Sequence, residues 1–337
     1  MRRVERLSEA ATNARRFRAA VIDEIRRLVP HDAYAWLLTD PVTGVGCDPL
    51  AEVPFFAELP RAVKLKYVTA ANRWTHLVEA GEAVGLLSEG DPSRSPMWSQ
   101  VLSRYGIGDA ASVVFADRFG IWGWLDLWRS EPFTAKEASY LSRLAIPITQ
   151  ALRARQAATL DAPSPPDRRL GPVVMVHDDE LRIESQTPAS EEWLRLLLPP
   201  VAGENVVPAA AYNVAAQLIA HEAKVDANRP MARVHLSDGV WVTLRAARLT
   251  SSNSGGSIAV TIEESSAIER IEVFARAFGL TRRETELLEL LPGVVDGADL
   301  ARRLYISEYT VQDHFKSIFA KTGAPNRQTL LARAAGR

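Results

Sequence analysis

The stretch Leu304–Gly323, LYISEYTVQDHFKSIFAKTG, decides how this chain is interpreted. Its spacing predicts a helix that is apolar on one side only, because Val311, Phe315 and Ile318 recur every three or four residues. The other side carries hydrogen-bonding groups from Tyr309, Gln312, Asp313, Lys316 and Ser317. Such a face is either a solvated surface or a binding surface, and the neighbouring sequence decides between them.

Four short helices are predicted from Thr281 onward. Thr281 and Glu284 have the spacing of a capping box at the start of the first helix. Either Asp296 or Gly297 starts the second helix, which ends near Leu304. The caps therefore predict an all-α segment in this part of the chain.

A three-residue turn, 305–307, joins the second helix to the third. Ser307 has the character of an N-cap, and Gly323 stands where a left-handed C-cap is expected. A turn of this length between two steeply crossing helices is typical of a helix-turn-helix. Seven apolar residues are expected to form its core: Leu287, Leu291, Leu300, Leu304, Val311, Phe315 and Ile318.

The second helix of such a motif lies in the DNA major groove. Ser307, Thr310 and the first backbone N–H groups are then placed to hold phosphate. Gln312 suits adenine, and Asp313 can accept from the N4 amino group of cytosine.

Two lysines, Lys316 and Lys321, lie farther along the helix. They are expected to reach phosphate or guanine. The alternative is a solvated helix face in a small bundle.

Residues 280–337 resemble the LuxR-type helix-turn-helix domain of bacterial transcription regulators. The matching positions are Leu280-Thr281, Arg283-Glu284, Leu288, Leu291, Leu300-Ala301, Leu304, Ser307, Thr310-Val311, His314, Lys316, Ile318, Lys321, Gly323 and Arg327. The resemblance implies a four-helix domain that binds specific DNA sequences as a dimer, with its last helix pairing across a two-fold axis. It also implies which residues contact or position the DNA backbone, namely Thr310, Val311, His314, Lys316 and Lys321. Gln312 and Asp313 are then the variable readers of base sequence.

Three positions depart from the family pattern. Val294 stands where the family usually has glycine, Gln312 where it often has lysine, and Thr322 where it has leucine.

The segment 278–337 has nine Lys and Arg against seven Asp and Glu, a surplus of two cations. This weak surplus predicts modest non-specific affinity and a need for dimerisation.

Composition bounds the rest of the chain. A length of 337 residues, 47% of them hydrophobic, fits two or three globular domains. The net charge of −1 excludes a uniformly basic nucleic-acid coat, though not a local DNA-binding surface. A single cysteine, Cys47, excludes an intrachain disulfide, and no apolar run is long enough to span a membrane. A cytoplasmic location is expected.

The predicted fold class is multidomain α+β. Residues 1–158 resemble a GAF domain in their order of helix, strands, helix, hairpin and helix, and they are expected to serve in sensing and dimerisation. Residues 172–265 resemble a PAS domain. The proline-rich stretch 159–171 is predicted as a linker and 266–279 as a connecting helix, followed by the helix-turn-helix domain 280–337.

Several elements are predicted inside these regions. One helix is expected over 9–28 and another over 134–157, where Thr134 and Glu137 form a capping box. A hairpin is expected over 111–130, and a second one has Asp238-Gly239 at its turn. The helices 8–28, 134–157 and 266–279 are candidates for dimer contacts.

Tryptophans in the first region are candidates for a ligand pocket. Trp36, Trp74, Trp98 and Trp124 are predicted to line a site for a small apolar or aromatic effector. The alternative for each is ordinary core packing.

The favoured hypothesis is a homodimeric DNA-binding transcription regulator whose upstream domains alter the placement of the recognition helices. One alternative is a protein-binding co-regulator whose helix-turn-helix does not bind DNA. Another is a small-molecule enzyme with a DNA-binding appendix, but no nucleophile motif, phosphate-binding loop or paired histidine motif supports it. No catalytic residue, metal or cofactor is therefore expected.

Overall fold

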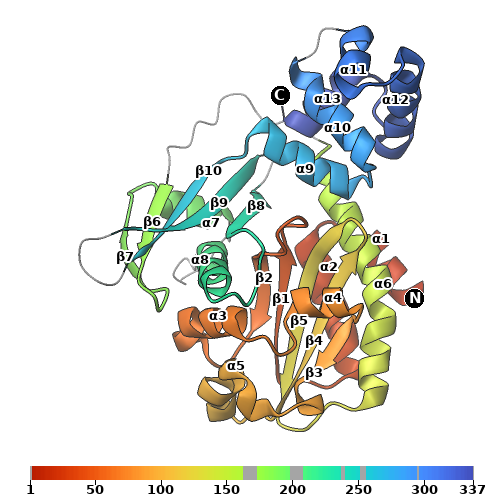
Figure 1. Ribbon diagram of the computed structural model, residues 1–337. Coiled ribbons are helices and arrows are strands. Elements are labelled where there is room, and N and C mark those ends of the chain that lie inside the picture. Colours follow the sequence, from red (N-terminus) through yellow and green to blue (C-terminus); the bar gives the residue numbers. More distant parts are fainter. Residues whose placement is uncertain are drawn as a thin grey trace. The chain divides into compact units, whose positions relative to one another are not determined.

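The computed structural model describes residues 2–161, 173–197, 208–236, 240–250, 256–293 and 296–336 (Figure 1). These residues fall into two compact units. The first lies within Met1–Leu152, Leu170–Val234 and Thr243–Glu263, and the second within Arg153–Arg169, His235–Val242 and Glu264–Arg337. Two antiparallel sheets and a separate group of helices confirm a multidomain α+β protein.

The first sheet has five antiparallel strands in the order β2-β1-β5-β4-β3. Its strands are β1 Ala33–Thr39, β2 Gly46–Glu52, β3 Val84–Leu86, β4 Asp109–Asp117 and β5 Gly120–Arg129. The predicted hairpin is confirmed, because Asp117 pairs with Gly120 across a tight turn between β4 and β5. The strand sequences are rich in Val, Leu and Trp, which suit a pleated surface that is buried on both faces.

Helices cover this sheet on both faces. They are α1 Arg2–Ala10, α2 Ala14–Leu28, α3 Leu59–Val68, α4 Trp74–Ala80, α5 Pro96–Gln100 and α6 Ala135–Ala158, with short 3-10 turns η1 Phe56–Glu58, η2 Leu87–Glu89, η3 Pro92–Arg94 and η4 Leu102–Tyr105. The capping box of α6 is confirmed by hydrogen bonds between Thr134 and Glu137. The prediction of one continuous helix over 9–28 is wrong. Asn13 caps a new helix there, with its side chain accepting from the Arg16 N–H at 2.9 Å.

The second sheet has the order β7-β6-β10-β9-β8. Its strands are β6 Val173–His177, β7 Ile183–Gln186, β8 Met231–His235, β9 Trp241–Arg248 and β10 Ile258–Glu264, and two helices, α7 Ser190–Leu197 and α8 Ala209–Glu222, accompany it. The predicted turn at Asp238-Gly239 and most of the predicted linker 159–171 lie outside the described residues.

Buried ion pairs join the two halves of the first unit. Asp40, after β1, accepts hydrogen bonds from Arg233 on β8 at 2.6 and 2.9 Å, and both side chains are fully buried. Arg73, before α4, lies 2.9 Å from Asp226, after α8. Helix α8 also packs against α3 and β2. Two segments far apart in sequence therefore share one interior.

The C-terminal part of the second unit has five helices within the described residues 264–293 and 296–336. They are α9 Ala267–Ala277, α10 Arg282–Leu290, α11 Gly297–Leu304, α12 Glu308–Thr322 and α13 Arg327–Ala335, with the 3-10 turn η5 Leu291–Gly293. All seven predicted core residues are buried, namely Leu287, Leu291, Leu300, Leu304, Val311, Phe315 and Ile318, and Leu288 and Leu330 are buried as well. Asp296 is the N-cap of α11, and Val294 lies outside the described residues. The predicted all-helical segment is thus confirmed.

Within the described residues, no helix combines the length and the apolar character needed to cross a membrane.

Candidate nucleic-acid interface

The turn between α11 and α12 is held by its own backbone. Tyr305 ends α11 in the left-handed conformation, with φ 56° and ψ 43°, and its N–H caps α11 carbonyls. The Ile306 N–H then donates to the Ala301 carbonyl at 3.0 Å. The Ser307 hydroxyl accepts from the Thr310 N–H at 3.1 Å, so that α12 begins at a capped end. The three-residue turn has the form that the sequence predicts.

Helix α12 separates its two faces clearly. Val311, Phe315 and Ile318 are buried in the helical core. The opposite face exposes Tyr309, Gln312, Asp313 and Lys316, which follow the i, i+3, i+4, i+7 spacing of one helix stripe. We call these four residues the α12 stripe. It offers an aromatic ring, an amide, a carboxylate and an ammonium group along a single line.

The charged groups of the α12 stripe contact each other. Lys316 Nζ lies 3.1 Å from Asp313 Oδ1, and the same ammonium group is 5.9 Å from the centre of the Tyr309 ring. Both charged side chains are well exposed, at 71% for Lys316 and 48% for Asp313, so water screens this pair. The ammonium group is therefore accessible to a phosphate.

Lys321 has a different environment. Its ammonium group lies 2.6 Å from Glu284 Oε2, and Glu284 is only 3% exposed at the start of α10. The Ser317 hydroxyl donates to the same carboxylate at 2.6 Å. Burial opposes ionisation of this carboxyl, but the hydrogen bonds from Lys321 and Ser317 outweigh it and lower the pKa of Glu284 to about 2. Lys321 thus fixes α12 onto α10, and its charge is already compensated.

The remaining predicted contact residues divide by burial. Val311 is fully buried, so its contribution is to position the helix rather than to touch a ligand. His314 is half-buried beside the core. Ser307 and Thr310 use their hydroxyls on each other, at 2.9 Å, at the capped end of α12. Of the eight predicted residues, only Gln312, Asp313 and Lys316 present exposed side chains on one line.

Two exposed aromatic residues were absent from the predicted site. Tyr305 is 94% exposed and Tyr309 is 73% exposed, although both are large. Arg302 and Arg303, in the last turn of α11 just before Tyr305, are exposed and pair with Asp299. The sequence did contain a signal for Tyr305. A helix-turn-helix turn favours a small residue in the left-handed conformation, so a large aromatic residue there indicates a role in binding.

The four candidate pocket tryptophans do not gather in one place. Trp36 pairs with Leu125, and Trp124 pairs with Leu37, so the two indoles lie on opposite faces of the sheet. Trp36 stacks on Phe115 with ring centres 4.9 Å apart. The prediction of a single site that includes Trp36 is corrected accordingly.

Two of these tryptophans do contact each other. Trp74 and Trp124 stack with ring centres 4.8 Å apart, and Lys66 Nζ lies 5.3 Å from the centre of the Trp124 ring. Lys66 also pairs with the buried Asp126 at 2.7 Å. Trp98 belongs to a neighbouring apolar cluster and donates to the Ile107 carbonyl at 3.0 Å. The faces of the two stacked rings are therefore occupied by other groups of the protein.

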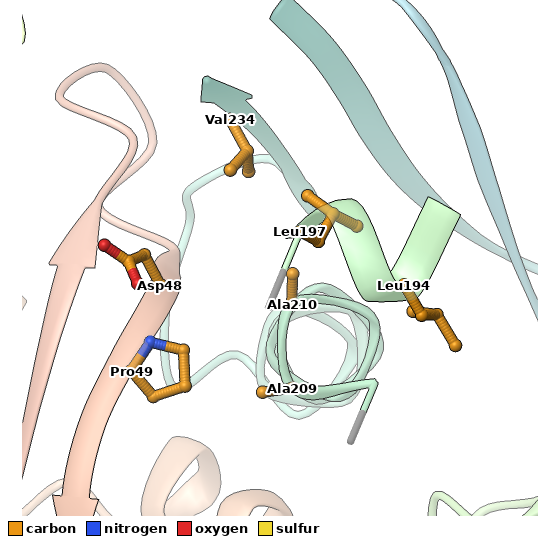
Figure 2. Close-up of a pocket in the computed structure, with 7 residues that line it drawn as sticks. All are labelled: Asp48, Pro49, Leu194, Leu197, Ala209, Ala210 and Val234. Carbon is orange, nitrogen blue, oxygen red and sulfur yellow. The ribbon is translucent and has the colours of Figure 1, made fainter. Parts of the chain in front are cut away.

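A small hollow lies elsewhere in the first unit. Figure 2 shows the residues that line it, which are Asp48, Pro49, Leu194, Leu197, Ala209, Ala210 and Val234. Its volume of about 10 Å³ is close to the room needed by a single water molecule. The Asp48 carboxylate already bonds to the buried Arg18 at 2.6 Å. Among the described residues, no group of three His, Cys, Asp or Glu side chains is placed to hold a metal ion.

Comparison with known proteins agrees with the helical geometry. Residues 279–334 match GerE, the family described as "Bacterial regulatory proteins, luxR family". A curated protein of Mycobacterium tuberculosis, named "Putative HTH-type transcriptional regulator Rv0890c", is 39% identical over 64 residues. That match spans 19% of this chain and only 7% of the length of the relative.

A solved structure also resembles the whole chain weakly. Escherichia coli SdiA has 12% sequence identity and a TM-score of 0.36, with 99% of this chain and 95% of the SdiA chain covered. A likeness at this level carries no argument about fold or function. The family match and the α11–α12 geometry together identify residues 279–334 as a luxR-family helix-turn-helix domain.

Proposed function

We propose that this protein is a transcription regulator that binds specific DNA sequences by placing α12 in the major groove. The observation that supports this most directly is the α12 stripe on a luxR-family domain. The buried side of α12 holds the domain together, and the stripe leaves polar groups and a cation at the surface. A helix of this width and exposure fits the major groove of B-form DNA.

The contacts divide between backbone and bases. The Lys316 ammonium group exchanges the exposed Asp313 carboxylate for a DNA phosphate, and the first N–H groups of α12 face a second phosphate. Gln312 bonds an adenine edge, and the released Asp313 carboxylate accepts from cytosine N4. Val311, His314 and Lys321 keep the helix at the required angle.

The active species in this proposal is a homodimer. A domain with a surplus of only two cations releases few counterions on binding, so one copy gains little affinity from phosphates. Two copies that bind half-sites separated by one helical turn, ~34 Å, double the contacts and add the information of two half-sites. The last helix, α13, is the proposed pairing element.

The upstream region acts as the sensory part. We assign the GAF-like role to 1–158 and the PAS-like role to 172–265, and we assign to this upstream region the response to a small apolar or aromatic effector. Helix α9 is a suitable mechanical link, because it packs against both α10 and α13. A change in the position of α9 then alters the spacing of the two recognition helices.

Selection of bound sites from a random DNA pool, with the full-length protein, tests the proposal. We expect enrichment of a two-fold symmetric sequence with half-sites about one helical turn apart. The variant Lys316→Ala should bind the selected duplex more weakly, whereas Lys136→Ala on α6 should bind normally. If the pool yields no enriched sequence and all three proteins shift DNA equally, the helix-turn-helix serves a protein partner instead.

A further inference from the structure

Two exposed tyrosines, Tyr305 at the turn before α12 and Tyr309 on the α12 stripe, have no structural role in the folded domain. Tyr305, at the turn, is 94% exposed, and Tyr309, in the first turn of α12, is 73% exposed. A large aromatic ring stabilises a fold chiefly through the area that it removes from water. These two rings remove little, so folding alone does not explain their presence.

The backbone at Tyr305 strengthens this point. Its φ of 56° lies in the left-handed region, which residues other than glycine and asparagine adopt at a cost. A glycine at this position would relieve that cost, and the exposed ring offers no packing in return. The side chain is therefore best explained by contact with something outside the chain.

The position of Tyr309 shows what it contacts. It lies one helical turn before Gln312 and Asp313 and two turns before Lys316, whose ammonium group is 5.9 Å from its ring. The ring thus extends the row of groups that address base edges, toward the end of the helix that enters the groove first. In the major groove an apolar group meets one apolar partner, the C5-methyl group of thymine.

The charges around the tyrosines favour DNA over a protein surface as the occupant. Arg302 and Arg303 stand next to Tyr305, at 76% and 49% exposure, and Lys316 stands next to Tyr309. The partner carboxylate of Lys316, Asp313, is 48% exposed, and Asp299, which pairs with both arginines, is 21% exposed. Water reaches both carboxylates, so a polyanion can replace them. A phenol hydroxyl beside such cations is a suitable donor to a phosphate oxygen.

We propose that Tyr309 packs on a thymine methyl group in each half-site, beside the base pairs read by Gln312 and Asp313, and that the Tyr305 hydroxyl donates to a DNA phosphate. This inference rests on the proposed function, since it requires α12 to lie in the major groove. It adds a thymine preference that comes from an apolar contact, and a backbone contact from a residue outside the helix.

The test replaces thymine by deoxyuridine, one position of the selected half-site at a time and in both half-sites together. Deoxyuridine keeps the base pair and removes only the methyl group. At one position, the substitution should weaken binding by the wild-type protein about fourfold per half-site. This factor corresponds to the free energy of burying one methyl-sized group. Tyr309→Ala should bind the thymine duplex more weakly and lose this sensitivity, and Tyr309→Phe should keep it.

Tyr305 has a separate readout. Tyr305→Phe should weaken binding to the selected duplex and to unrelated duplexes by the same factor, because a phosphate contact carries no sequence information. Both tyrosines are exposed, so unfolding curves of the variants should match wild type and exclude a folding defect.

The outcomes separate the inference from the proposed function. If no duplex is bound specifically, the proposed function fails. If binding is specific but every deoxyuridine substitution affects wild type and Tyr309→Ala equally, or if the selected half-site has no thymine, the Tyr309 contact is excluded while the proposed function stands. If Tyr305→Phe binds like wild type, the phosphate contact is excluded.

Discussion

Lys321 Nζ on α12 lies 2.6 Å from Glu284 Oε2 on α10, and the same carboxylate accepts from the Thr281 N–H at 2.6 Å. A single carboxylate therefore completes the capping box of one helix and anchors the recognition helix to it. The sequence predicts the same DNA contact for Lys316 and Lys321, but the structure gives them different tasks.

Replacing these lysines should separate the two tasks. Lys321→Met leaves the buried Glu284 without its cation, and we expect it to lower the free energy of unfolding by about 2 kcal/mol, less than for a fully buried pair because Lys321 is partly exposed. Lys316→Met should change stability by less than about 0.5 kcal/mol, since its pair is exposed. Denaturant unfolding of both variants measures the difference, and equal losses would contradict it.

Acid should destabilise the helix-turn-helix domain through Glu284. Its pKa falls from 4.5 to about 2 in the folded domain, so the folded state favours the ionised form. The stabilisation is complete above the pKa of the unfolded chain and is lost as the pH falls from about 5 toward 2, with a total near 3 kcal/mol. Unfolding curves across this range should show a steeper loss of stability in wild type than in Glu284→Gln, which retains only the contribution of the other carboxyl groups, such as Glu286.

Salt dependence should report the phosphate contact of Lys316. In wild type the logarithm of the DNA association constant should fall linearly with the logarithm of salt concentration. Lys316→Ala should reduce the magnitude of that slope by about one per recognition helix, and should weaken binding to all sequences alike. Titrations at several salt concentrations test this, and an unchanged slope would remove Lys316 from the contact.

Tyr305→Gly should make the domain more stable and its DNA complex weaker. Glycine accepts the φ of 56° without strain, and no buried contact is lost, so the free energy of unfolding should rise by roughly 0.5–1 kcal/mol. Thermal unfolding and DNA titration on the same preparation provide both values. Tyr305→Ala is the matched control, because it removes the ring but keeps the left-handed strain.

Removal of either partner alone from the pair between Arg73 and Asp226 should be strongly destabilising. Arg73→Met leaves Asp226, which is 2% exposed in its side chain, without a counterion, and we expect a loss of about 3–5 kcal/mol. Lys64→Ala breaks an ion pair with Glu180 that also joins the two halves of the first unit but is partly exposed. Its effect should stay below about 1 kcal/mol.

Local signals in the sequence predicted the helical part well, because caps and turns depend on neighbouring residues. Thr281 with Glu284, Ser307 and Gly323 each stand at the boundary that their chemistry suggests. The apolar spacing of Val311, Phe315 and Ile318 likewise places the core face correctly. A local signal was missed at Asn13, which caps a helix in the middle of an apparently continuous pattern.

Pairings between distant residues were not predictable in this way. Nothing near Lys321 indicates that Glu284 neutralises it, and nothing near Asp40 indicates Arg233, which is 193 residues away. The alternation along β5 gives the relative faces of its own side chains, but the opposite placement of Trp36 and Trp124 depends on how β1 pairs with β5. Long-range register and charge pairing therefore had to come from the structure.

The fully buried pair of Asp40 and Arg233 restricts how the protein can be dissected. A fragment that ends or begins within 159–171 keeps only one member of this pair and one member of the Arg73–Asp226 pair. Each remaining charge then lacks its counterion, on a surface that the missing half covers in the full chain. Such fragments are expected to aggregate or to stay bound to chaperones when expressed alone. Division after Glu263, the last residue of the first unit, breaks neither pair and is the better starting point for expressing the two parts of the chain separately.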